Sequence, residues 1–438
     1  MTTSADVGTS GDVGQAIRAA GAEVLAQALR DSRRDTLATF AAVDAALAQT
    51  GQTVPQRAEL NPPLWELGHT GWFQSHWLAL NNQRPRGFLA NPDAPRPSCP
   101  GDALYDSSRV PHASRWSLPL PDADATRATL DKQLAQTLAL LQAMQEPLGA
   151  QDAQTADAAL YFFRLALLHE DMHHEAALTM AQSLGLQVDD PRWRPQSLAD
   201  ANPGLAFEAG PWRLGFDGPG FGFDNELGAH ELALPACQID SRVVRWAEYL
   251  LFVEAGGYTD VRWWSAAGGA WLAGLDSADK NQADPRRDDG RQAHHLPRYL
   301  RRRGAAWQQQ RHGEWLTLDA NLPACHLSYF EAQAWCHWAG RRLPTEAEWE
   351  RAACCQAAHQ NATFAWGEVW EWTSTVFNPY PGFVAHPYRD YSAPWFGSRQ
   401  VLRGASRATQ PRMHHPRYRN FFTAERTDIF AGFRSCAI

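Results

Sequence analysis

Lysine is almost absent from this sequence of 438 residues: it occurs only at Lys132 and Lys280, so arginine carries nearly all of the positive charge. Acidic residues outnumber basic ones by 48 to 40, which gives a formal net charge of −8, and there is no long basic run. Non-specific binding to nucleic acids depends on clustered lysine and arginine. The composition therefore predicts no nucleic-acid partner.

Long apolar runs are also missing, since none approaches the ~18 residues that a membrane span needs. The first residues, MTTSADVGTSGDVG, have neither the basic nor the apolar region of a secretory signal. The seven cysteines are scattered without CxxC spacing, which is typical of a reducing compartment. We therefore expect a cytoplasmic protein without a membrane partner, whose residues 1–12 are disordered.

Composition changes near residue 200. Before it, stretches rich in Ala, Leu and Gln have apolar residues three and four apart, which indicates helices. We expect a first helix over 13–49 with a break near Asp31, a second after Pro62-Pro63, a third after PLPDAD, and a fourth over about 155–184 that ends at Gly185. A four-helix bundle over residues 13–195 buries all four apolar stripes.

Residues 201–438 have a different character, with dense Gly, Trp, Arg and Pro and mostly short segments. Helical periodicity is sustained only around SYFEAQAWCHWAG and PTEAEWERAA. These features predict a second domain and an α+β fold for the chain, with the helical bundle first. We expect most tryptophans of this domain to lie in its core, namely Trp335, Trp338, Trp349 and Trp372.

The segment LHEDMHHE carries the most informative pattern. His169 and His173 are four residues apart, so on a helix both project from one face, about one turn apart. One helix offers two imidazoles to a metal in this way. The same pair can instead be satisfied by hydrogen bonds in a core, because burying an imidazole costs free energy unless it has a partner.

A second helix favours the metal. His69 lies in WELGHTGWF, among aromatic residues and glycines that allow close approach, and bundle cores often hold metals between facing helices. Three neutral imidazoles would leave coordination positions open, and they suit Fe, Zn, Cu or Ni. His76, seven residues later, is the competing first ligand. Glu170 and Asp171 are candidates to orient a ligating imidazole through its other nitrogen.

These residues resemble a known family. HEDMHHE, with the upstream GHTGWF, looks like the DinB-type iron-binding bundle of the ergothioneine-pathway sulfoxide synthases. The second half is similar to their partner domain, the formylglycine-generating-enzyme-like fold related to C-type lectins. The matching segments occur in order and include GFDNELGAH, HLSYFEAQAWCHWAGRRLPTEAEWERAA, WGEVWEWTSTVFNPYPGF, QVLRGASRAT and YRNFFTAERTDIFAGFR.

The resemblance implies a nonheme iron(II) enzyme that uses O₂ to join a chalcogen donor to C2 of the imidazole of hercynine (Nα-trimethylhistidine). Its motifs place the iron ligands at His69, His169 and His173. They also make Tyr380, in PYPGF, a candidate active-site tyrosine that supplies a proton or a hydrogen atom. The same residue can equally be a loop tyrosine packed beside two prolines.

The resemblance also places a substrate pocket at Asn420 and Phe421, and aromatic faces suit a trimethylammonium group. Two positions depart from the family. Met172 stands where a glutamine commonly precedes the third histidine, and Phe422 stands where one subtype has an acidic residue that helps to hold γ-glutamylcysteine. Arg426, placed by its loop position, is a further candidate for contact with the donor.

These departures, together with NPPLWELGH and ALYDSSRVPH, look most like the selenoneine synthase branch, whose donor is the selenosugar 1-seleno-β-D-glucose. A neutral sugar needs hydrogen-bonding groups more than a charged clamp. An ergothioneine-type enzyme that uses γ-glutamylcysteine or cysteine stays open. So do a zinc-dependent DinB-type thiol transferase and a lectin-like binding protein whose bundle is only a scaffold.

One activity found among relatives of the second domain is not expected. Formylglycine-generating enzymes need a cysteine pair near the segment that here reads RMHHPRYRN, and no cysteine lies there. Cys354 and Cys355 are adjacent in an expected helix, and Cys436 is near the end of the chain. The sequence therefore argues against modification of sulfatases.

Overall fold

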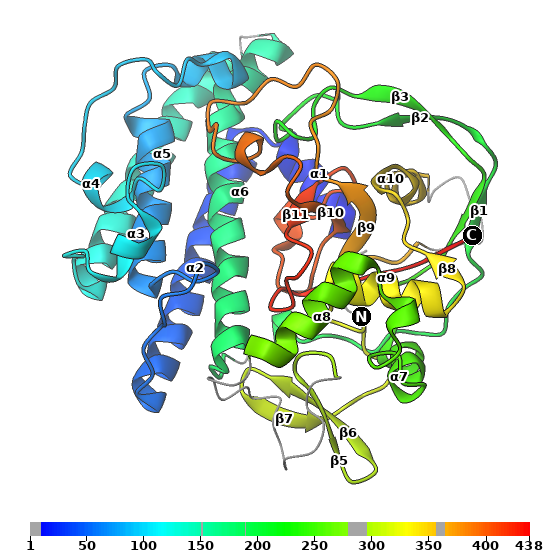
Figure 1. Cartoon of the computed structure of the whole chain (residues 1–438). Coiled ribbons are helices and arrows are strands. Elements are labelled where there is room, and N and C mark those ends of the chain that lie inside the picture. Colours follow the sequence, from blue (N-terminus) through cyan, green and yellow to red (C-terminus); the bar gives the residue numbers. More distant parts are fainter. Residues whose placement is uncertain (1–9, 150–151, 189, 279–295, 356–363) are drawn as a thin grey trace, which may run out of the picture.

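The computed structural model describes residues 10–149, 152–188, 190–278, 296–355 and 364–438. A helical bundle comes first, and a domain of small sheets and short helices packs beside it (Figure 1). The expected α+β fold is confirmed. Residues 1–9 of the segment expected to be disordered lie outside the described residues, but residues 10–12 belong to a helix, so the expectation was wrong for these three.

Four long helices form the bundle in the described part of the chain, as predicted. Helix α6 packs along α2 and against α3, and both α2 and α3 also contact α5. Gly185 ends α6 in the left-handed region, with φ of 66°, where a glycine carries no steric penalty. None of the described helices is long and apolar enough to cross a bilayer. The four helices are α2 (Ala22–Thr50), α3 (Pro63–Gln74), α5 (Ala123–Gly149) and α6 (Ala153–Leu184).

The first expected helix is two helices, and the break near Asp31 was wrong. A separate helix α1 (Ser10–Arg18) comes before α2, whose N-terminal cap is Gly21. Helix α1 leaves the bundle and packs on the second domain, where the Arg18 guanidinium donates two hydrogen bonds to the buried Glu226 carboxylate. Helix α1 therefore links the two domains.

The long connection between α3 and α5 packs mainly on the bundle itself. Its segment η2 lies against α6, and α4 lies against α3. An exposed ion pair between Asp93 and Arg389 joins it to the second domain. Its short helices, beginning with one π turn that continues α3, are η1 (Ser75–Ala79), η2 (Arg84–Leu89), α4 (Asp102–Tyr105) and η3 (His112–Trp116).

Four small sheets organise the described part of the second domain. Their strand orders are β1-β4-β13-β8, β11-β10-β9-β12, β2-β3 and β5-β6-β7. Within the second sheet, β10 pairs antiparallel with both β9 and β11, which places Asn420 opposite Leu402. The strands are β1 (Leu205–Phe207), β2 (Gly210–Leu214), β3 (His230–Leu234), β4 (Cys237–Ile239), β5 (Leu300–Arg303), β6 (Ala306–Arg311), β7 (Glu314–Thr317), β8 (Arg341–Arg342), β9 (Trp370–Val376), β10 (Gln400–Gly404), β11 (Asn420–Phe422), β12 (Ala431–Gly432) and β13 (Cys436–Ala437).

Short helices surround these sheets. Ser328 and Thr345 each begin a helix as part of a capping box, in which a glutamate three residues later returns a hydrogen bond to the cap. The helices are η4 (Pro191–Trp193), α7 (Trp246–Glu254), η5 (Val261–Trp263), α8 (Ala266–Ala278), α9 (Tyr329–Trp338), α10 (Glu346–Cys354), η8 (Ala393–Trp395) and η9 (Pro411–Met413).

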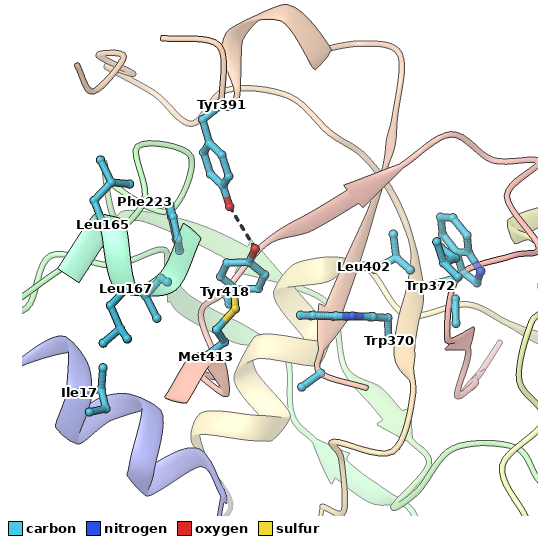
Figure 2. Packing of buried hydrophobic residues seen from close by; sticks show 14 of the residues in the cluster. Ile17, Leu165, Leu167, Phe223, Trp370, Trp372, Tyr391, Leu402, Met413 and Tyr418 are labelled. Atoms are coloured by element: carbon cyan, nitrogen blue, oxygen red, sulfur yellow. Dashed lines mark hydrogen bonds between the residues drawn. The ribbon is translucent and has the colours of Figure 1, made fainter. Parts of the chain in front are cut away.

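One hydrophobic core runs through both domains. Leu165 and Leu167 of α6 belong to the same cluster as Phe223, Trp370 and Tyr418 of the second domain (Figure 2). Of the tryptophans expected in the core, Trp338 is half-buried and the other three are buried: Trp335, Trp349 and Trp372. The domains therefore share a core, and a movement of α6 would disturb both.

Candidate metal centre

Three histidines from two helices converge inside the bundle. His69 comes from α3, and His169 and His173 come from α6. One ring nitrogen of each lies within 4.8 Å of the others. His69 and His169 are buried, and the side chain of His173 is 21% exposed. The structure thus brings together the three residues that the sequence pattern had selected as ligands.

Hydrogen bonds on the outer nitrogens orient two of the rings. His69 Nδ1 lies 2.8 Å from the backbone oxygen of Tyr105, to which it donates, and His173 Nδ1 is paired with the Glu66 carboxylate. Both Nε2 atoms are left for the space between the helices. His173 Nε2 lies 3.2 Å from His169 Nε2. An outer hydrogen bond of this kind fixes the tautomer and direction of a metal-binding imidazole.

Burial keeps His69 and His169 neutral. Together, burial and then the neighbouring His173 lower the pKa of His69 to about 3, although Glu66 and the Tyr105 backbone act in the opposite direction. Burial also lowers the pKa of His169 well below its usual value, with His173 and His69 adding to the effect. Neutral imidazole is the form that binds a metal, so the site does not need to release protons from these two rings at neutral pH.

Glu66 is a functional residue that the sequence analysis missed. Burial alone would raise its pKa, but the charge and hydrogen bond of His173, followed by His69 and Asn61, lower it to about 2. The ionised carboxylate also accepts from Asn61 Nδ2, whose own oxygen accepts from Arg115 at 2.8 Å. Glu66 precedes His69 by three residues, so both share a helix face, and that spacing was the signal available.

The two carboxylates that were expected to orient the ligands accept hydrogen bonds from other side chains instead. Glu170 accepts from the guanidinium of Arg33 and from Gln74, and Asp171 accepts from Arg412. That expectation was wrong because neighbouring residues of a helix point to different sides, and only every third or fourth faces the histidines.

The competing histidine lies apart from the cluster. The His76 ring contacts the rings of Trp72 and Trp77, at centroid distances of 4.8 and 4.6 Å. Seven residues from His69, it is displaced by two helical turns and falls in the π turn that follows α3. The three histidines whose ring nitrogens lie close together include His69 and not His76.

Aromatic rings from both domains enclose the histidines. Phe73 stacks on His169 with a centroid distance of 3.5 Å, and Trp65 stacks on His69 at 4.8 Å. Tyr388, from the second domain, approaches His169 edge-on at 5.9 Å. Burial raises the pKa of the Tyr388 phenol, which keeps it protonated at neutral pH. The sequence analysis missed Tyr388, which lies eight residues after the tyrosine that the motif suggested.

Tyr380 lies in a different environment. Its hydroxyl donates to Glu346 at 3.2 Å, and its ring packs under the guanidinium of Arg419 at 4.0 Å. Leu214 and Leu234 complete a small hydrophobic cluster around it. These contacts satisfy both the hydroxyl and the ring, as the alternative of a packed loop tyrosine anticipated.

The expected substrate residues lie on and beside β11. Phe421 stacks on Phe377 at a centroid distance of 4.1 Å, and the half-buried Asn420 accepts from the backbone of Phe421 through its side-chain oxygen. On α6, Met172 accepts a hydrogen bond from the hydroxyl of Tyr418 at 3.5 Å. Met172 is therefore tied to the chain that leads into β11 two residues later.

Arg426 is already paired. Its guanidinium donates two hydrogen bonds of 2.6 Å to the Asp428 carboxylate. The same group lies 5.0 Å from the centre of the Phe422 ring. Its charge is therefore balanced within the loop.

Two family models match the chain: the DinB superfamily at residues 28–177, and the sulfatase-modifying factor enzyme 1-like domain at residues 194–368 and 365–437. A hercynine oxygenase of Mycolicibacterium thermoresistibile is 30% identical over 94% of this chain and 94% of its own length. The hercynine oxygenase of Mycolicibacterium smegmatis is 31% identical over 94% of this chain and 98% of its own. This chain belongs to the hercynine oxygenase family.

Likeness to formylglycine-generating enzymes is narrower. The enzyme of Bos taurus is 33% identical over 36% of this chain and 41% of its own length. The hercynine oxygenase family, by contrast, accounts for both domains. The three imidazoles of this chain also fit a borderline transition metal such as iron(II), because histidine nitrogens are common ligands of such metals and hydrogen bonds fix the outer nitrogens of His69 and His173.

We predict that Glu66→Gln weakens binding of a divalent metal by about 10- to 100-fold, because the His173 ring loses the carboxylate that orients it. His173→Ala should abolish binding. Both can be measured by titrating the metal-free protein with Co²⁺ and following its absorption bands. His76→Ala is the matched control and should bind as the unsubstituted protein does. Unchanged affinity in His173→Ala, or lost affinity in His76→Ala, would contradict the assignment.

Proposed function

We propose that this protein is an iron(II)- and O₂-dependent oxidoreductase that joins a chalcogen donor to C2 of the hercynine imidazole. The observation that carries the proposal is the convergence of three histidines, two of them kept neutral by burial, in a chain related over nearly its whole length to hercynine oxygenases. His69, His169 and His173 would hold the metal. Iron bound there would supply the activation of O₂, which is the oxidant for forming the carbon–chalcogen bond.

Tyr388 is the residue that we assign to proton supply. Its ring lies against His169, and burial keeps its phenol protonated. A positioned acid of this kind contributes by protonating a reacting group at the moment it becomes basic. Tyr380 would hold the fold of its loop through Glu346 and Arg419 instead.

Asn420 and Phe421 are suited to the zwitterionic end of hercynine. The stacked rings of Phe421 and Phe377, with Tyr391 edge-on at 5.9 Å, offer aromatic surface to a trimethylammonium group. The side-chain NH₂ of Asn420 is not engaged by the bond that its oxygen makes, so it can donate to the substrate carboxylate.

Two arginines near the site, Arg426 and Arg115, already have partners within the protein. This favours a neutral donor, which we propose is a selenosugar. Arg426 is neutralised by Asp428, and Arg115 donates to Asn61 while stacking over Trp65 at 3.9 Å. A donor with two carboxylates would have to displace these partners and would lose their hydrogen bonds. A sugar needs only neutral donors and acceptors. The first product would carry the sugar on selenium, and release of the sugar would then leave selenoneine.

A thiol donor is the second candidate. Its support is the relationship to hercynine oxygenases, which extends over both domains. If Arg426 exchanged the Asp428 carboxylate for a carboxylate of the substrate, it could bind γ-glutamylcysteine. A zinc-dependent thiol transferase is the more distant alternative, because the DinB match alone is compatible with it.

The proposal is tested by incubating the protein aerobically with Fe²⁺ and hercynine, while 1-seleno-β-D-glucose, γ-glutamylcysteine and cysteine compete. We expect mass spectrometry to show selenoneine as the main product and its formation to need both O₂ and iron. A sulfoxide adduct as the main product would show that the donor is a thiol and not the selenosugar. Turnover of a thiol with zinc and without O₂ would contradict the oxygenase activity, as would no product with any donor.

Tyr388→Phe should keep its metal and lower the rate of carbon–chalcogen bond formation by about 100-fold or more, since a positioned acid commonly contributes that much. Oxidised donor should accumulate in place of the adduct. Tyr380→Phe changes the same atom in a neighbouring loop and should retain the product ratio of the unsubstituted protein. If the two variants exchange these outcomes, Tyr380 is the proton source and our assignment of Tyr388 is wrong.

Asp428→Asn should free the charge of Arg426 for a carboxylate. We expect kcat/KM for γ-glutamylcysteine, relative to the selenosugar, to rise about tenfold, which corresponds to roughly 1.4 kcal/mol. Asp260→Asn is the matched control, because Asp260 holds Arg262 through an equally close pair elsewhere in the domain. An unchanged ratio in Asp428→Asn would show that Arg426 does not select the donor.

A further inference from the structure

Helix α6 contacts the other histidine-bearing helix with one face and the second domain with the opposite face. His169 and His173 point toward α3. Because a helix turns by about 100° per residue, the opposite face, roughly 200° away from the histidines, carries Asp171, Glu175 and Gln182. In Figure 1, α6 stands between the other bundle helices and the second domain. The helix that carries two of the three metal-binding histidines is therefore also the helix that meets the second domain.

The first contact on this face is an ion pair at Asp171, midway between the two histidines. Arg412 of η9 donates from Nε at 3.0 Å and from Nη2 at 2.8 Å to its two carboxylate oxygens. Ser32 of α2 donates to the same group at 2.7 Å. Asp171 is fully buried, so its charge has to be met by these partners.

The second contact is one turn further along, at Glu175. Its carboxylate accepts from Trp370 Nε1 at 2.7 Å, from Ser406 Oγ at 2.8 Å and from Thr409 Oγ1 at 2.7 Å. All three donors belong to the second domain. Three directional bonds from the second domain restrain both the height and the rotation of this turn of α6.

The third contact lies near the end of the helix. Gln182 accepts from the backbone nitrogen of His312 at 2.7 Å and donates to the backbone oxygen of Gln310 at 3.2 Å. Beside it, Gly313 approaches Gly185 so closely that a Cβ atom on Gly313 would lie 2.2 Å from the Gly185 oxygen. The second domain thus holds α6 at three levels on one side.

We infer that the second domain sets the position of α6, and through it the fit of His169 and His173 to His69, with Arg412 as a positioning residue. The physical reason is the tolerance of a metal site. Metal–imidazole bonds are about 2.0–2.1 Å long and accept deviations of only about 0.2 Å, so a small slide or turn of α6 would spoil the triangle. His69 is anchored separately, by the Tyr105 backbone inside the bundle.

The bundle alone does not supply the partners that Asp171 and Glu175 use. Of the hydrogen bonds to these two carboxylates described above, only the one from Ser32 comes from the bundle. In the full chain Asp171 is buried and Glu175 is half-buried, and most of their hydrogen bonds come from the second domain. Docking of the second domain therefore holds both carboxylates, and with them the turn of α6 that carries the two histidines.

The test uses substitutions in the second domain only, so that the sequence of α6 is unchanged. In the full-length protein, Arg412→Met and the pair Ser406→Ala with Thr409→Val should each weaken Co²⁺ binding by about tenfold or more, as loss of an orienting partner does at metal sites. The absorption bands of bound Co²⁺ should also change in position or intensity, since they report the geometry of its ligands. Arg412→Lys should restore part of the affinity by retaining the charge.

The matched control is Arg242→Met, which breaks the ion pair with Glu248 in the second domain away from α6. It should lower the melting temperature and leave both the cobalt affinity and the spectrum unchanged. If Arg412→Met fails to fold, Arg412→Lys and the Ser406/Thr409 pair carry the test. Unchanged affinity and spectrum in folded Arg412 and Ser406/Thr409 variants would overturn the inference alone. Failure of the unsubstituted protein to bind Co²⁺ would overturn the metal site as well.

Discussion

Three imidazoles packed within 4.8 Å of one another in a protein interior are the constraint on which the rest of this structure depends. Such a group costs least when the rings are neutral and their outer nitrogens are hydrogen-bonded. Burial achieves the first for His69 and His169. The Tyr105 backbone and the Glu66 carboxylate achieve the second for His69 and His173. What remains are inward-facing nitrogens in the arrangement that a transition metal uses.

The two domains divide the remaining work. The bundle supplies the histidines, and the second domain supplies Tyr388 beside them and the aromatic residues on β11. It also meets the carboxylates on the far side of α6. The charge balance of Arg426 and Asp428 then accounts for the preference that we propose between a neutral and an acidic donor.

Local patterns predicted the bundle, its C-terminal glycine cap and the histidine pair, because helical spacing alone sets which side chains share a face. Helical spacing alone could not choose between His69 and His76, since the choice depends on how α3 lies against α6; the family motif favoured His69, which lies beside His169 and His173. Glu66 and Tyr388 were missed for a related reason: their partners are 107 residues away for Glu66 and in the other domain for Tyr388. The break before α2 was misplaced in the prediction because it depends on a contact between distant parts of the chain. Arg18 of α1 pairs with Glu226 of the second domain, which the local pattern does not show.

The most direct test of the central claim is a crystal structure of the Fe²⁺-loaded protein, grown without O₂, with anomalous diffraction measured on both sides of the iron absorption edge. The account predicts one strong iron peak bonded to the Nε2 atoms of His69, His169 and His173, at about 2.0–2.2 Å by analogy with other metal–imidazole bonds. An iron peak at His76, or no peak between α3 and α6, would contradict it.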